Sequence, residues 1–246
     1  MKKAPRDPRE VFEGFTSDCK TAFGPELEAI CLYGSGARGE YVPGRSDINF
    51  LVLLSEEGIG QLQKAFPLVA KWGKRAVAIP LFLTRDYVKR SLDAFPLEFL
   101  DMKLHHLLVY GESDPLSDLE IDRGDLRLQC EREVKGKLLA LREAYVGTRG
   151  RPKELSLVIS RSINAFAVIF EGLLWLRDRV IPPSRREVFG ELCREAGLRE
   201  EVFLAALAVK EGRVKPSREE LMRLFTDYME EVRRLARWVD QMEAER

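Results

Sequence analysis

The sequence predicts two parts of different fold class: an α/β (α+β) domain with a small mixed sheet, followed by an all-α helical bundle. Up to about residue 110, short apolar runs typical of buried strands alternate with helical patterns. From about residue 125 the strand patterns stop, and apolar residues recur at steps of three and four. The Ser-, Asp- and Pro-rich stretch 111–118 lies between these parts and is typical of a loop. We therefore predict domains at 1–122 and 123–246.

Four short apolar segments are expected to form the sheet, at 29–33, 48–54, 76–83 and 107–110. Pro80 has no amide donor, so the third segment is expected at an edge or with a bulge. Helical spacing predicts helices over 7–23 and about 55–72. Thr84 and Pro96 are typical of the first turns of two shorter helices.

Five helices are expected in the second domain, because each periodic segment is bounded by a turn or a capping signal. Ser217 and Glu220 form the pattern of a capping box at the start of the last one. Short connections between such helices predict an antiparallel bundle. The expected helices cover about 125–145, 155–179, 185–196, 200–211 and 217–242.

The composition excludes several classes of protein. Forty basic and forty acidic residues cancel, so the basic surface needed for non-specific nucleic-acid binding is not expected. The four cysteines show no metal-ligand spacing, which indicates buried free thiols in a reducing compartment. No signal peptide is recognisable, and no apolar run reaches the about 18 residues of a membrane helix, since Asn164 and Glu171 interrupt the longest. A soluble, cytoplasmic protein is predicted.

The high charge content has a second implication. A third of the residues are charged, yet there are only two Asn and four Gln, a combination typical of a thermophile protein.

The segment 32–54, LYGSGARGEYVPGRSDINFLVLL, carries the chemistry that the sequence predicts. A Gly-Ser turn follows a buried strand, and a glycine there lets backbone amides approach a phosphate closely. Ser35 adds a hydroxyl donor, and Arg38 adds a charge that pairs with phosphate oxygens. Asp47, at the start of the next strand, can hold a divalent cation against that phosphate.

This segment resembles the signature of the DNA polymerase β-like nucleotidyltransferase superfamily: Gly-Ser, a second Gly, then Asp-x-Asp entering a strand. Gly34-Ser35, Gly39 and Ser46-Asp47 occupy the matching positions. The helical second half is similar to the bundles appended to antibiotic and minimal nucleotidyltransferases. The resemblance implies a nucleotidyltransferase-like first domain in which a nucleoside triphosphate is bound by its phosphates. The implied phosphate-binding residues are Gly34, Ser35, Gly36, Arg38 and Ser46.

The sequence departs from this family in its metal-binding acids. In the family, both carboxylates of Asp-x-Asp bind magnesium, and a third acid on a later strand shares a metal. Here the second position is Asn49, and 76–83, where the third acid is expected near Pro80 or Leu81, contains no Asp or Glu. Each missing electrostatic contact typically costs about 10²–10³ in rate. We therefore expect a degenerate site with Asp47 and Asn49 at the catalytic positions, and Asp47 binding at most one Mg²⁺.

Three functions remain open. The leading hypothesis is a protein that binds a nucleotide or another phosphate ligand with weak or lost transfer activity. The first alternative is an active enzyme that moves a nucleoside monophosphate from a triphosphate to a hydroxyl of a small molecule or protein, recruiting an acid such as Asp86, Asp93 or Glu98. The second is a non-catalytic interaction module with a protein partner or as a homo-oligomer. A membrane or nucleic-acid partner is not expected.

Several of these residues also have ordinary structural interpretations. Arg38 can be a surface arginine, and Asp47 can cap a turn. Capping and surface exposure also explain the carboxylates of the 93–101 segment, including Asp101. His105 and His106 lack ligand partners at useful spacing and are expected to be structural. Arg161 and Asn164 either line a substrate groove or form interhelical hydrogen bonds.

Overall fold

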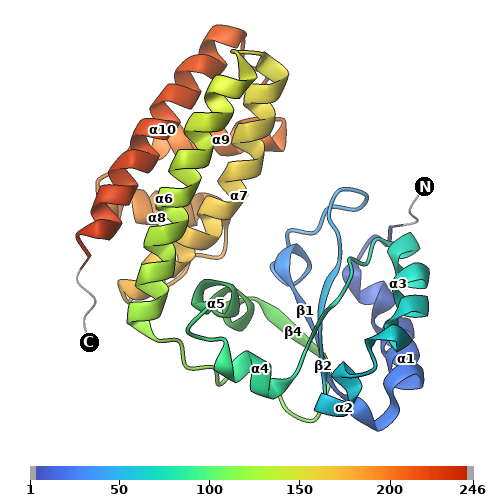
Figure 1. Cartoon of the computed structure of the whole chain (residues 1–246). Helices are drawn as coiled ribbons and strands as arrows, with labels where there is room; N and C mark the ends of the chain where they lie inside the picture. Colours follow the sequence, from blue (N-terminus) through green and yellow to red (C-terminus); the bar gives the residue numbers. More distant parts are fainter. Residues whose placement is uncertain (1–3, 243–246) are drawn as a thin grey trace. The chain divides into compact units, whose positions relative to one another are not determined.

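The computed structural model describes residues 4–242, and the chain divides into two compact units, 1–121 and 122–246 (Figure 1). The first unit contains a four-stranded sheet with helices, and the second contains helices α6–α10. This is the predicted fold class, a small mixed sheet with flanking helices followed by an all-helical region.

The sheet has the order β3-β2-β1-β4 and is mixed. The central strand β1 pairs antiparallel with β2 and β4, whereas β3 pairs parallel with β2. Both β1 and β2 are almost entirely buried, which explains their continuous apolar sequences. The strands are β1 (Leu27–Tyr33), β2 (Asn49–Leu54), β3 (Leu81–Leu83) and β4 (His106–Tyr110).

The third strand is shorter than the predicted segment 76–83. Only β3 is a continuous strand, and before it Val77 forms an isolated parallel bridge with Ile48. Pro80 lies in the interruption, where its missing amide donor prevents a continuous ladder. The irregularity expected at this proline is therefore observed, and the first half of the predicted segment does not form a continuous strand.

One face of the sheet packs against α1 (Phe12–Phe23) and α3 (Phe66–Trp72) (Figure 1). The Phe15 ring stacks on Phe50 of β2 with a centroid distance of 4.4 Å, and Trp72 meets Phe15 edge-on at 5.8 Å. The Trp72 indole donates a 2.8 Å hydrogen bond to Asp18. This aromatic cluster orients β2, and therefore the polar residues at its start.

The helix predicted over about 55–72 is divided into three pieces. α2 (Glu56–Ile59) and a 3-10 turn (Leu62–Ala65) precede α3. Pro67 lies in the first turn of α3, where it needs no amide partner, but it cannot continue a helix that began earlier. The other helices of this unit, α4 (Arg85–Arg90) and α5 (Pro96–Leu104), lie on the opposite side of the sheet from α1 (Figure 1).

In the second unit, the long helix α7 contacts each of the other four helices. Its centre carries Phe166 and Phe170, which meet rings from α8, α9 and α10 at centroid distances of 5.0–5.8 Å. The helices are α6 (Arg123–Thr148), α7 (Pro152–Leu176), α8 (Arg185–Ala196), α9 (Glu200–Glu211) and α10 (Arg218–Asp240).

The apolar character of α7 has a packing explanation. By length and composition alone this helix could cross a membrane, unlike the interrupted run expected from the sequence. More than half of its most apolar window, 56%, is buried within the protein. Its Asn164 accepts hydrogen bonds from Arg185 and Lys210, which is the interhelical use anticipated for this residue.

All four cysteines are free and buried. Burial raises the pKa of Cys19, Cys31 and Cys193 to about 12, so these thiols are protonated and unreactive at neutral pH.

Candidate phosphate-binding site

The glycine turn follows β1 directly. Gly34–Gly36 form a 3-10 turn in which the amides of Ala37 and Arg38 both donate to the Gly34 carbonyl at 3.1 Å. The first amides of a helical turn have no acceptor within it, so those of Ser35 and Gly36 are the ones that can bind an anion.

The start of β2 lies against this turn. Asn49 pairs with Tyr33 in the sheet register. A side chain at position 34 would place its Cβ 3.0 Å from Nδ2, the side-chain amide nitrogen of Asn49, and the φ of Gly34 is +70°. The backbone conformation therefore favours glycine, and any larger residue would also have to displace the Asn49 side chain. The turn and the residue at the second acid position are in direct contact.

Alternation along β2 determines the direction in which Asn49 points. Phe50 and Val52 belong to the core cluster on the α1 side. Asn49 and Leu51 consequently face the other side of the sheet, where α4 and α5 lie. In the same cross-strand row, Tyr33 of β1 lies next to Asn49 and His106 of β4 lies beyond Tyr33, and burial raises the pKa of Tyr33.

Ser46 and Asp47, which lie three and two residues before β2, differ in their surroundings. Asp47 is exposed, as a carboxylate that captures a cation from solvent must be. The Ser46 hydroxyl accepts a 3.1 Å hydrogen bond from the Val42 amide and closes the turn 42–46. Ser46 therefore has a structural task in addition to the phosphate contact that the sequence suggested.

Arg38 is paired with Asp101 of α5. The Arg38 side chain is only 8% exposed and that of Asp101 is 18% exposed. Neither residue is therefore the exposed surface group that its ordinary structural interpretation predicts. The pair joins the glycine turn to α5, across 63 residues of sequence. No local pattern could have revealed it.

The neighbouring part of the third strand offers no carboxylate. Leu51 pairs with Leu81, and Ile48 bridges to Val77, so the chain beside Asn49 is Ala78-Ile79. The next acid along the chain, Asp86 on α4, is exposed and pairs with Arg90 at 2.8 Å. Asp93 and Glu98, the other carboxylates considered, are also exposed.

His106 has protein partners at both ring nitrogens. Nδ1 is 2.8 Å from the Met102 carbonyl, and Nε2 is 2.7 Å from the Asp114 carboxylate. Burial disfavours the charged form of Asp114, but hydrogen bonds from the Leu116 amide and from His106 together hold the pKa of Asp114 below its usual range. These contacts fix the start of β4 and fit the structural interpretation of this histidine.

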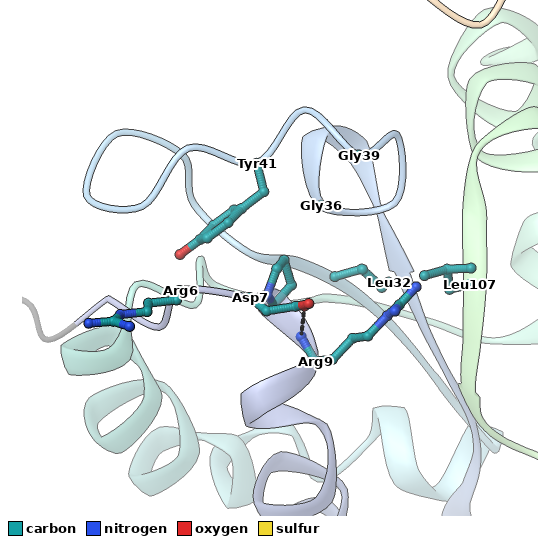
Figure 2. Close-up of a pocket in the computed structure, with 9 residues that line it drawn as sticks. Arg6, Asp7, Arg9, Leu32, Gly36, Gly39, Tyr41 and Leu107 are labelled. Carbon is teal, nitrogen blue, oxygen red and sulfur yellow. Dashed lines mark hydrogen bonds between the residues drawn. The ribbon is translucent and has the colours of Figure 1, made fainter.

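A pocket of about 260 Å³ lies on the α1 side of the sheet (Figure 2). It is lined in part by Gly36 and Gly39, and we call the segment that carries them the glycine loop. Leu32, Leu107 and Tyr41 line this pocket. The Tyr41 hydroxyl donates a 3.2 Å hydrogen bond to the Pro5 carbonyl. The Arg9 side chain extends beneath the loop, whereas that of Arg6 turns outward. The sequence does not predict this pocket, because its arginines lie at an ordinary helix start.

The small mixed sheet followed by a helical region is a nucleotidyltransferase-like fold. Among solved structures, the chain is similar to spectinomycin adenyltransferase AAD(9) from Enterococcus faecialis, solved with ATP and spectinomycin, with a TM-score of 0.51. The match covers 92% of this chain and 99% of that one at 13% identity, so the likeness concerns the fold. No protein-family model and no curated protein matches the sequence.

Proposed function

We propose that this protein binds a nucleotide or another phosphate ligand at the glycine turn and has weak or lost transfer activity. The contact between Asn49 and Gly34 is the observation that carries the proposal, because it puts an amide at the place where a second carboxylate would bind metal beside the phosphates. An amide oxygen can ligate magnesium, but it brings no negative charge and does not bridge two ions.

In this proposal the backbone amides of Ser35 and Gly36 and the Ser35 hydroxyl bind phosphate oxygens, and Arg38 supplies positive charge. Asp47 fits one Mg²⁺, since it is an exposed carboxylate two residues before Asn49 on the same strand entry. Magnesium would neutralise phosphate charge there. Beyond Asp47 itself, neither Asn49 nor the chain 76–83 supplies a carboxylate for a second ion.

Our proposal of weak or lost transfer activity rests on the residues that lie beside Asn49 in the strand register. In-line phosphoryl transfer needs charge neutralisation on both the attacking and the leaving oxygen. The chain beside Asn49 is apolar, and Asp86 is engaged by Arg90. AAD(9) was solved with ATP, which makes ATP the first nucleotide to test here.

An active nucleotidyltransferase is the second candidate, and one observation favours it. Glu98 and Asp101 lie three residues apart on α5, His105 follows the end of this helix directly, and Asp101 reaches Arg38 beside the glycine turn. An acid from α5 would then replace the one missing from the third strand. A non-catalytic interaction module, the third candidate, predicts no ligand at the turn. We place the protein in the cytoplasm as part of the same proposal.

Calorimetric titration with each of the four nucleoside triphosphates, with and without Mg²⁺, tests the proposal. We expect binding of at least one triphosphate that changes only modestly with Mg²⁺. The variant Ser35→Ala should weaken it, whereas Ser117→Ala, an exposed serine elsewhere in the unit, should not. Strict dependence on Mg²⁺ with turnover would favour the active enzyme, and no binding would leave the interaction module.

A further inference from the structure

The pair formed by Arg38 and Asp101 has a consequence for ligand binding that rests on the proposed function. The Arg38 amide donates to Gly34 within the turn, so the residue is anchored at the proposed phosphate site. Its guanidinium is held by a carboxylate from another element. A nearly buried guanidinium requires such an acceptor, because an unpaired buried charge is costly.

We propose that Asp101 is an internal competitor for anionic ligands, which occupies Arg38 until a phosphate group replaces its carboxylate. Carboxylate and phosphate both offer the planar arginine two oxygens, so the exchange preserves the charge-assisted hydrogen bonds of Arg38. The displaced Asp101 then remains near the ligand as a like charge. Its effect on affinity must increase with the negative charge of the ligand.

This assigns Asp101 a role in ligand discrimination. With Asp101 present, a ligand gains Arg38 only if its phosphate outcompetes a tethered carboxylate, which weakens the binding of every phosphate ligand. At the same time, like-charge repulsion limits how tightly a triphosphate is held. Removing the carboxylate therefore improves binding of every phosphate ligand, and improves the most highly charged one most.

The test compares ATP, AMP and adenosine by calorimetry on the parent, Asp101→Asn and Asp93→Asn. Asp93→Asn is the matched control, since it removes the same charge from an exposed site in the segment before α5. For Asp101→Asn we expect ATP to bind about tenfold more tightly, AMP less than that, and adenosine unchanged. Asp93→Asn should change none of the three appreciably.

Weaker or unchanged ATP binding in Asp101→Asn, with ATP still bound by the parent, would overturn the competitor role alone. If neither the parent nor either variant binds ATP, the proposed function itself fails. A measurement on the parent covers the case of a variant that does not fold: ATP should shift the Arg38 Nε and the Asp101 carboxyl carbon together in NMR spectra. A shift of neither signal on saturation with ATP would also overturn the exchange.

Discussion

Asn49 packs so closely against Gly34 that a Cβ at position 34 would lie 3.0 Å from the side-chain amide nitrogen of Asn49. The two residues come from adjacent strands, one at the end of β1 and one at the start of β2. The glycine turn and the altered acid position are therefore one structural unit. A change at either residue should be felt at the other.

Gly34→Ala tests this coupling, and Gly39→Ala is its control. Both glycines have a positive φ, +70° and +75°, so each substitution carries the cost of a left-handed backbone, about 1–2 kcal/mol. Only position 34 also meets Asn49, since nothing lies within 4 Å of a Cβ at position 39. In urea unfolding, Gly34→Ala should lose roughly 1 kcal/mol more than Gly39→Ala. Equal losses would show that Asn49 moves aside freely.

Asn49→Asp restores the second carboxylate without restoring the third. We expect the affinity for Mg²⁺-ATP to increase, because an added negative charge beside Asp47 strengthens cation binding. Transfer should still not appear, since the chain beside position 49 remains apolar. Release of pyrophosphate from each triphosphate, followed for the parent and the variant, is the measurement. Turnover in the variant alone would place another acid, such as Asp101, in the site.

The sequence predicted the parts of the molecule that local physics determines. Continuous apolar runs identified all four strand regions, and the Ser217 capping box is present, with the Ser217 hydroxyl accepting from the Glu220 amide at 3.2 Å. Pro80 indicated where the third strand would be irregular. Each of these signals depends on neighbours within a few residues.

The contacts that join distant segments were missed. Asp101 was assigned to capping or surface exposure, yet it pairs with Arg38, 63 residues earlier. The pocket under the glycine loop combines residues 6–9, 32–41 and 107, which become neighbours only through the sheet. The long helix expected over 55–72 failed for a different reason: its apolar spacing was right, but Pro67 imposes a new start.

Asp114→Asn should lower stability in a pH-dependent way. The folded-state pKa of Asp114 lies below its ordinary value of 3.8, so the carboxylate stabilises the fold above that pH, and this contribution is lost as the pH falls through the folded pKa. Since its side chain is a third exposed, we expect about 1 kcal/mol at neutral pH. Urea unfolding at neutral pH and at about pH 2 should show the difference from the parent disappearing in acid.

The control for this prediction is Asp118→Asn, an exposed acid in the same segment. It should match the parent at both pH values. A pH-independent loss in Asp114→Asn would mean that its hydrogen bonds, rather than its charge, hold the segment.

Glu231 and Glu230 are adjacent on α10 but differ in burial, which makes them a matched pair for testing the second unit. The Glu231 side chain is 1% exposed. Its carboxylate accepts a hydrogen bond from Nε of Arg199 at 2.7 Å and another from the backbone amide of Arg199 at 3.0 Å. Although burial disfavours the charge, these bonds hold the pKa of Glu231 below its usual range. Glu231→Gln removes the buried carboxylate partner of Arg199, whose other carboxylate contact is with Asp227 at 3.2 Å, and should cost about 2–3 kcal/mol in urea unfolding. Glu230→Gln breaks only an exposed pair with Arg233 and should leave the midpoint unchanged. If both variants unfold alike, the buried pair contributes no more to stability than a surface pair.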